Sequence, residues 1–286
     1  MRHRCIAYDR IIDADRPVVG AVPCETSEAA CSERLRIHWH DPVPASPVER
    51  PVWTRAPDAL WFDPPGVARY RCTVDTIDVT PIFDGAPDMV DALLIATALP
   101  AVMWLDGAIM LHAAAVVPPG AARALAIAGP SGCGKSRIAA ALLARGAAFV
   151  ADDSIAVRPR DAGPVCAGLA GGYHLAGHLG ARDEDARPFH LVGSDRARRS
   201  APLGAVVILD DAPGRMRLTG VAGVAALLAN RHRASVPQIC GIEPRTLGDM
   251  ARLVSAVRVY RWSTGEADAL LDDAIRAHIM SDGDRG

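Results

Sequence analysis

A glycine-rich octapeptide and a pair of adjacent aspartates are the residues of this sequence whose types and spacing could do chemistry. Residues 129–136 read Gly-Pro-Ser-Gly-Cys-Gly-Lys-Ser, which fits the pattern G-x-x-x-x-G-K-[ST]. In this pattern, backbone N–H groups cradle a polyphosphate, the lysine reaches its terminal phosphates, and the last hydroxyl ligates Mg²⁺. The sequence therefore predicts binding of ATP and Mg²⁺. The predicted nucleotide-binding residues are Gly129, Pro130, Ser131, Gly132, Cys133, Gly134, Lys135, Ser136 and Arg137.

The segments that flank the octapeptide are those that such a loop needs. Residues 123–128 form a short apolar run typical of a strand, and residues 137–145 have the spacing of a helix that Gly146 ends. The N-terminus of that helix would add unpaired N–H groups and partial positive charge to the phosphate site. Strand, glycine loop and helix thus follow one another in the required order.

Asp152 and Asp153 follow a second apolar run that starts after Gly146. We expect this run to form a strand beside strand 123–128 in a parallel sheet, joined to it by the helix as a right-handed crossover. Its carboxyl end would then lie next to the glycine loop. One carboxylate could organise Mg²⁺ while the other accepts the proton of an incoming hydroxyl. The alternative is that both aspartates only end a strand or form a turn.

A second acidic run competes for the magnesium role. Residues 202–211 are apolar and end in Asp210 and Asp211, the usual form of the acidic strand in ordinary ATPases of this class. In that interpretation Asp210 would hold Mg²⁺, and the pair at 152 and 153 would be secondary. We prefer the pair at 152 and 153 because their short link to Ser136 favours neighbouring strands. Asp210 would then end a further strand before the turn at residues 212–214.

At this point the residues resemble a known family. The octapeptide, Leu-Leu-Ala-Arg-Gly at 142–146 and Phe-Val-Ala-Asp-Asp at 149–153 are similar to the core of HPr kinase/phosphorylase. The resemblance implies an α/β fold with a P-loop nucleotide-binding core of the HPr kinase C-terminal-domain type. It also implies that Asp153 is the proton acceptor. Residues 109–116 resemble the family's strand with an active-site histidine, here His112. The implied catalytic residues are Asp153, Lys135 and His112, and the metal ligands are Ser136, Asp152 and Asp153.

The sequence departs from this family in three regions. Residues 165–174 have no acidic residue where the bifunctional members have one that helps to hold metal, so the second metal ligand is unassigned. The catalytic arginine of the family has no certain counterpart, although Arg196, Arg198 and Arg199 lie in a suitable region; each could equally belong to a solvated basic loop. The C-terminal segment used for dephosphorylation is not recognisable. We therefore expect kinase activity without a strong phosphorylase activity.

Residues before the glycine loop resemble one subgroup of this family. Residues 60–80 and 99–112 are similar to stand-alone HPr-kinase-related proteins encoded with ribosomally made peptides. That group includes kinases of the C-terminal serine of lasso-peptide precursors. The resemblance implies an ATP-dependent serine kinase whose partner is a peptide or small-protein serine substrate, and it implies a homo-oligomer. The alternatives are an HPr-directed serine kinase/phosphorylase and a non-catalytic ATP-binding regulatory protein.

Composition limits the remaining function classes. A net charge of −2 over 286 residues argues against a general nucleic-acid binder. Seven cysteines without a C-x-x-C pair, and an N-terminus without a secretory signal, favour reduced thiols in the cytoplasm. The longest apolar stretch, residues 89–105, is broken by Asp91 and Pro100 and is shorter than the ~20 residues that cross a bilayer. We expect it to be a buried helix that ends near Pro100, and we expect no membrane partner.

The positions of residues that break helices and strands predict three parts of the chain: a smaller β-rich N-terminal lobe at residues 1–88, a P-loop kinase domain at 89–280 and a mobile tail at 281–286. Strands are expected at 34–40 and within 60–82, where Tyr70, Cys72 and Val74 alternate with polar residues. Further predictions are helices at 221–230, 247–255 and 266–280 and an edge strand at 257–262. Arg231-His-Arg233 is expected to be a solvated helix end, the alternative being contact with phosphate or an acidic peptide.

Overall fold

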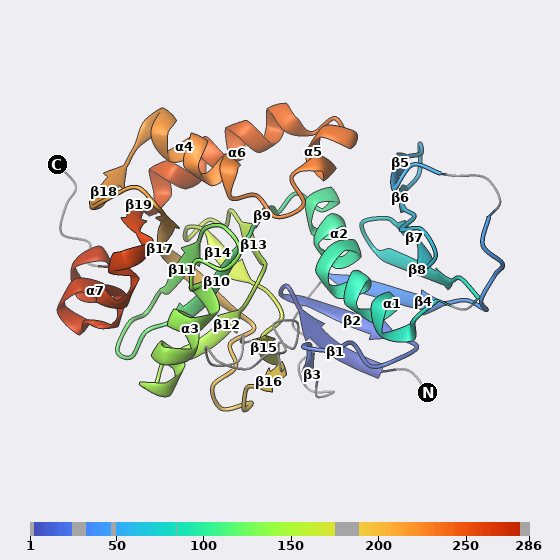
Figure 1. Cartoon of the computed structure of the whole chain (residues 1–286), viewed down its shortest axis with the longest axis horizontal. Helices are drawn as coiled ribbons and strands as arrows, with labels where there is room; N and C mark the ends of the chain where they lie inside the picture. The colour runs from blue at the N-terminus through green and yellow to red at the C-terminus, as the bar shows by residue number, and fades with distance from the viewer. Residues whose placement is uncertain (1–2, 25–32, 47–49, 84, 175–188, 281–286) are drawn as a thin grey trace.

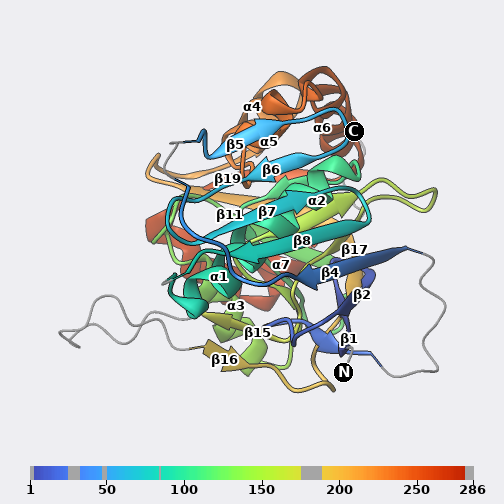
Figure 2. The ribbon, with the colours of Figure 1, turned by 90° about the vertical axis from the view of Figure 1, so that its right-hand side faces the viewer.

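The computed structural model describes residues 3–24, 33–46, 50–83, 85–174 and 189–280, and it has a mixed α/β fold with two large sheets (Figure 1). The first large sheet has eight strands in the order β3-β1-β2-β4-β8-β7-β6-β5. It forms the blue and cyan part of Figure 1, and Figure 2 shows its strands one below another, from β5 at the top to β1 at the bottom. Its strands are β1 (His3–Ala7), β2 (Arg10–Ala14), β3 (Val22–Pro23), β4 (Arg34–Trp39), β5 (Trp53–Arg55), β6 (Leu60–Phe62), β7 (Ala68–Cys72) and β8 (Thr76–Pro81).

The strands expected at residues 34–40 and within 60–82 are confirmed by β4 and by β6 to β8. Tyr70 and Cys72 on β7 are fully buried, as the alternation predicts. Val74 does not continue the pattern, because it lies in the turn between β7 and β8, and it is 48% exposed. The alternating face therefore ends two residues earlier than expected.

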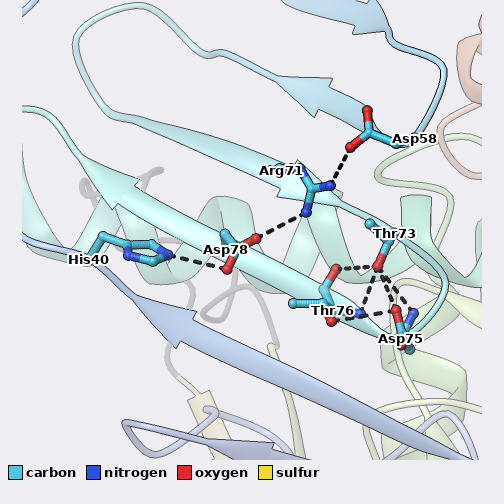
Figure 3. A network of polar contacts seen from close by, with 7 residues as sticks. All are labelled: His40, Asp58, Arg71, Thr73, Asp75, Thr76 and Asp78. Atoms are coloured by element: carbon cyan, nitrogen blue, oxygen red, sulfur yellow. Dashed lines mark hydrogen bonds and ion pairs between the residues drawn. The ribbon is translucent and has the colours of Figure 1, made fainter.

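Polar contacts fix the hairpin of β7 and β8 (Figure 3). Arg71 and Asp78 are cross-strand partners, and Arg71 Nη1 lies 3.4 Å from Asp78 Oδ2. In the turn, Thr73 Oγ1 donates to Asp75 Oδ1 at 2.7 Å and accepts the N–H of Thr76 at 3.0 Å. A threonine hydroxyl that bonds to the backbone ahead of it stabilises a tight turn, so the register of this hairpin is set locally.

A helical run lies between the two large sheets, with one part against β7 and another against β9 (Figure 1). It consists of α1 (Pro87–Leu93), the π-helical turn η1 (Leu94–Ala98) and α2 (Leu99–Leu105). The prediction that the helix ends near Pro100 is wrong. Pro100 lies in the first turn of α2, directly after η1, a position where its missing N–H breaks few helical bonds. By length and composition the run Pro87–Leu105 could cross a membrane, but buried core helices pass the same test, and 56% of its apolar window is buried.

The second large sheet has nine strands, of which seven follow the order β12-β10-β11-β17-β14-β13-β9. β19 pairs with β17, and β18 pairs with β19. The strands of this sheet are β9 (Ile109–Leu111), β10 (Ala113–Val117), β11 (Ala124–Ala128), β12 (Ala148–Ala151), β13 (Ile155–Arg158), β14 (Val165–Ala167), β17 (Ser200–Asp210), β18 (Arg215–Leu218) and β19 (Arg258–Ser263). A small separate hairpin is formed by β15 (Gly172–His174) and β16 (Phe189–Leu191).

Five strands of this sheet run in one direction, and one of them is β13, because β13 and β17 are both antiparallel to β14. β17 is parallel to β11, and β19 is parallel to β17. β12 also runs this way, because β11 and β12 are both antiparallel to β10. The carboxyl ends of β11, β12, β17 and β19 therefore lie along one edge.

The expectation that β12 is the direct neighbour of β11 is wrong, because β10 lies between them. β10 precedes both strands in the chain, and it occupies the position beside β11 that we expected for β12. The parallel neighbour of β11 is β17 instead. The prediction that the carboxyl end of β12 is near the glycine loop does not depend on this pairing, as the site geometry below shows.

Helices cover both faces of the second sheet. Leu125 and Ile127 on β11 pack in a cluster with α3 (Lys135–Ala144), whereas Ala126 and Ala128 face the cluster that includes α4 (Gly220–Ala229), α5 (Ser235–Ile239) and α6 (Glu243–Ala256). Figure 1 shows α3 and α4 to α6 on opposite sides of the strands. α3 therefore packs on one face of β11, because every second residue of the strand points to that face.

The C-terminal elements agree in part with expectation. α4 and α6 confirm the helices at 221–230 and 247–255, but the strand at 257–262 is not an edge strand, because β19 lies between β17 and β18. The helix expected at 266–280 is split into the 3₁₀ helix η2 (Thr264–Leu271) and α7 (Asp273–Met280). Asp272 has extended backbone and accepts the N–H of Ile275, which starts a new helix there. The tail at 281–286 lies outside the described residues.

The hairpin of β1 and β2 reaches across to the second sheet. Tyr8 and Asp9 form its two-residue turn with φ of +53° and +61°, values that such turns require. Tyr8 is fully buried, and its hydroxyl lies 2.7 Å from Ser154 Oγ. Its N–H donates to the carbonyl of Gly168. The tip of the hairpin is therefore packed against the residue that follows Asp153.

Candidate functional site

The glycine loop joins β11 to α3, which confirms the expected strand–loop–helix order. Gly129, Gly132 and Gly134 have φ of +141°, +84° and +98°, which L side chains rarely adopt. At Gly129 an added Cβ atom would lie 2.5 Å from the carbonyl oxygen of Leu209 on β17. A glycine is required there because the loop passes directly over the end of the neighbouring strand.

Lys135 and Arg137 leave the loop in different directions. Lys135 is the first residue of α3, and its ammonium donates to the carbonyl oxygens of Gly129 at 2.9 Å and Pro130 at 2.8 Å. It is 6% exposed, so the charge is held inside the loop. Arg137 forms a 2.7 Å ion pair with Asp268 of η2. The loop thus has a cation at its centre and another toward η2.

Asp152 lies next to the loop. Ser136 Oγ donates a 2.9 Å hydrogen bond to Asp152 Oδ1, although the two residues are at opposite ends of the α3 crossover. Hydroxyl and carboxylate oxygens are the ligands that Mg²⁺ prefers. Ser136 and Asp152, two of the three predicted metal ligands, are therefore in direct contact although they lie on separate elements.

Asp153 turns away from Asp152 toward His112. It has φ of +67°, an uncommon conformation for a residue with a side chain, and its side chain is 59% exposed. His112 lies at the break between β9 and β10, and its Nδ1 donates to the carbonyl oxygen of Asp153 at 2.8 Å. The same nitrogen is 3.4 Å from Asp153 Oδ1. Unusual backbone of this kind occurs often at functional sites.

The Arg231-His-Arg233 segment follows α4 and packs beside His112, so the expectation of a solvated helix end is wrong for Arg231 and His232, whereas Arg233 is exposed. The N–H of His112 donates to the carbonyl of Asn230, and the rings of His112 and His232 lie 5.9 Å apart. His232 is 7% exposed, and burial lowers its pKa below the ordinary value. Arg231 is bound by both oxygens of Glu243 at 2.7 and 2.9 Å. The backbone pairing of this segment with β9 has no signal in the sequence.

Part of this group lines one open cleft of about 740 Å³, whereas Lys135, Ser136 and Asp152 are not among its described lining residues. One wall holds Gly129, Pro130, Ser131, His112 and Asp153, and residues 229–233 continue it. The segment of β5 and β6 and the helical run contribute Val52, Trp53, Phe62, Leu93 and Thr97 to the lining. No pattern in the sequence assigns these mainly apolar residues to a site, because nothing in the chain indicates that the two sheets meet here. A larger cavity of about 930 Å³ lies near Arg123 and Arg145, away from the glycine loop.

Other candidates from the sequence have different partners. Asp210 Oδ1 accepts the N–H of Ala212 at 2.9 Å, and its Oδ2 is 3.9 Å from Arg261 Nε. Asp210 ends a strand, as predicted. The preference for Asp152 was based on β11 and β12 being direct neighbours, which is wrong because β10 lies between them. The contact between Ser136 and Asp152 supports the preference instead. Arg196 Nη1 donates to the carbonyl of Leu143, near the end of α3 opposite the loop. Arg196, Arg198 and Arg199 are not among the described residues that line the cleft.

The solved structures that are similar to this chain include that of a bacterial kinase/phosphatase. The structure of the HPr(Ser) kinase/phosphatase from Coxiella burnetii matches 59% of this chain and 95% of its own, with 15% sequence identity and a TM-score of 0.38. No protein-family model matches the chain, and neither does any curated protein. Function is therefore inferred from the geometry of the site.

Proposed function

We propose that this protein is an ATP-dependent kinase that transfers the γ-phosphoryl group to a serine hydroxyl of a peptide or small protein. The observation that carries the proposal is the 2.9 Å contact between Ser136 and Asp152, with Asp153 lining the same cleft as the start of the glycine loop. A loop of this type alone occurs in many nucleotide-binding proteins. The neighbouring carboxylate pair adds a place for metal and for a proton.

The residues at the loop fit ATP and Mg²⁺. The left-handed glycines let backbone N–H groups face a polyphosphate, and the N-terminus of α3 contributes further donors. Ser136 and Asp152 would hold Mg²⁺ through oxygen, directly or through water, and Asp153 is the further carboxylate at this edge. Bound Mg²⁺ supplies charge neutralisation on the β- and γ-phosphates. Lys135 and the loop amides would stabilise charge on the transferred group.

Asp153 would act on the acceptor. As the serine Oγ forms its bond to the γ-phosphorus, the bond from that phosphorus to the bridging oxygen breaks and ADP leaves. The proton of the serine hydroxyl passes to an Asp153 carboxylate oxygen, which is exposed to the cleft. His112 holds the Asp153 carbonyl through Nδ1 and would orient a phosphate oxygen with its ring. Positioning and electrostatics supply most of the rate in this chemistry.

The resemblance in the sequence suggests the acceptor class, so our first candidate is a serine of a ribosomally made precursor peptide, with the C-terminal serine as the position to test first. We place the reaction in the cytoplasm, where ATP is available and the cysteines found free in the described residues stay reduced. The homo-oligomer stays a prediction.

The test is incubation of the protein with ATP, Mg²⁺ and either a serine-ended precursor peptide or purified HPr, followed by mass spectrometry of each acceptor. We expect a phosphate increment on the peptide that is lost in an Asp153→Asn variant. An increment on HPr alone would favour the HPr-directed alternative. ATP binding with no modified acceptor would instead favour a nucleotide-binding regulatory protein.

A further inference from the structure

Three possible metal ligands meet in the cleft beside the glycine loop. His112, Asp153 and His232 each offer one ligand atom, and these atoms lie within 4.8 Å of one another. Among the residues that the structure describes, this is the one such group of three or more histidine, cysteine, aspartate or glutamate side chains. The three come from the β9–β10 break, the turn after β12 and the segment after α4, so the fold brings them together from distant parts of the chain.

Both histidines are held through one ring nitrogen by a backbone carbonyl. His112 Nδ1 donates to the carbonyl of Asp153 at 2.8 Å, and His232 Nε2 donates to the carbonyl of Ala96 at 3.0 Å. A carbonyl can only accept, so these nitrogens carry the protons. In the neutral rings the lone pairs are then on His112 Nε2 and His232 Nδ1. Histidines that bind metals nearly always have their other N–H fixed by a carbonyl or carboxylate in this manner.

Supporting contacts hold the second histidine at the cleft wall. Arg233 Nε donates to the same Ala96 carbonyl at 2.8 Å, and the N–H of His232 donates to the carbonyl of Met110 on β9. Asp153 is the open side of the group, because its side chain is 59% exposed while His232 is 7% exposed. An ion could therefore enter from the cleft on the side of the exposed Asp153 carboxylate and meet the two histidine rings behind it.

We propose that His112, Asp153 and His232 form a binding site for a zinc-type divalent transition-metal ion, separate from the oxygen site of Ser136 and Asp152. Two imidazole nitrogens and one carboxylate oxygen suit Zn²⁺ or Co²⁺, whereas Mg²⁺ prefers oxygen ligands alone. Ligand atoms about 2.1 Å from one ion are up to about 4.2 Å apart, so the three side chains, and the exposed Asp153 carboxylate above all, would have to move to bring His112 Nε2, His232 Nδ1 and a carboxylate oxygen around one ion. Water would complete the coordination from the cleft side.

One consequence rests on the proposed function. An ion on Asp153 occupies the carboxylate that would accept the serine proton, so the site would switch off phosphoryl transfer without removing ATP from the glycine loop. This makes the group a candidate point of metal control. The binding itself does not require that the protein be a kinase.

The test is titration of tag-free, metal-stripped protein with Co²⁺ alone, without nucleotide or acceptor, by calorimetry and visible absorption. We expect one Co²⁺ per chain with bands typical of nitrogen ligands. His112→Ala and His232→Ala should each weaken binding by at least about tenfold, the scale at which even outer-sphere partners of a metal act. The matched control is His40→Ala, which removes a histidine that also lies beside a carboxylate, Asp78 at 3.2 Å, but on the first sheet; its affinity should be unchanged.

His232 is buried, so circular dichroism must show that its variant folds. Asp153→Asn, which changes a mainly exposed side chain, gives a second test that does not depend on His232. Equal Co²⁺ affinity in the wild type and in the His112, His232 and Asp153 variants would overturn the site, as would no saturable binding by the wild type. Because no ATP is present, either result leaves the kinase proposal standing, and a failed kinase assay leaves this titration unaffected.

Discussion

The hydroxyl of Ser136 and the carboxylate of Asp152 are 2.9 Å apart, one at the start of α3 and the other just beyond the strand that follows it. The contact joins the two sequence features that could do chemistry. The next residue, Asp153, has a left-handed backbone and lines the cleft. Asp152 thus lies on the loop side and Asp153 on the cleft side.

Asp153→Asn should lower phosphoryl transfer by ~10²–10⁴ and leave ATP affinity nearly unchanged, because an amide cannot accept the serine proton at the same position. Because the side chain is mainly exposed, the variant should fold like the wild type, which thermal unfolding can check. Turnover and the ATP dissociation constant are to be measured on the same preparation. Full turnover in this variant would remove Asp153 from the mechanism.

Gly129→Ala should weaken ATP binding by about tenfold or more, equivalent to about 1.4 kcal/mol. The new Cβ atom would lie 2.5 Å from the Leu209 carbonyl oxygen and 2.8 Å from Cys133 Sγ, so the loop must move. Gly132→Ala is the matched control, because no heavy atom lies within 4 Å of its added Cβ and only the strain of positive φ is introduced. Calorimetric titration with ATP compares the two, and an equal effect of both substitutions would argue against the steric account.

Tyr8 and Ser154 should show a coupling free energy of about 0.5–1.5 kcal/mol, the usual net value of a buried hydrogen bond. Urea unfolding of Tyr8→Phe, Ser154→Ala and the double variant measures it as a cycle. Their oxygens are 2.7 Å apart and link the first sheet to the residue after Asp153. Tyr70→Phe is the control, because its hydroxyl bonds to Val90 and its effect should simply add to that of Ser154→Ala. Additivity in the Tyr8 cycle would show that the contact contributes nothing.

The free energy of unfolding should fall as the pH rises above about 10. Burial raises the pKa of Tyr8, so the unfolded chain loses this proton at a lower pH than the folded protein. The stabilising contribution is complete below the unfolded pKa and is lost as the pH rises toward the folded one. Tyr8→Phe cannot ionise, so its stability should decline less steeply between about pH 9 and pH 11. Urea midpoints across this range give both slopes, and parallel slopes would contradict the assignment.

Local features of the site could be predicted from the sequence. The loop, the helix after it and the strand before it depend on residues within about one turn of one another, and the left-handed glycines are visible as glycines. The proximity of Asp152 to Ser136 follows from a short crossover. These predictions use interactions between close neighbours in the chain.

Non-local pairing could not be predicted in the same way. β10 separates β11 from β12. The segment from β11 through α3 to β12 contains no pattern that indicates that an earlier strand lies between its two strands. The burial of His232 depends on its backbone bond to Met110, and a basic segment after a helix usually faces water. Pro100 was expected to end a helix, but the preceding π turn accommodates it.

The central claim, that the glycine loop and Asp152 form one Mg²⁺-nucleotide site, is tested most directly by the Mg²⁺ dependence of ATP affinity. Calorimetric titration with and without Mg²⁺ should show that Mg²⁺ strengthens ATP binding to the wild type and to Asp210→Asn, but has little effect on Asp152→Asn. The same Mg²⁺ dependence in Asp152→Asn as in the wild type, with loss of that dependence in Asp210→Asn, would contradict the account and transfer the metal to the end of β17.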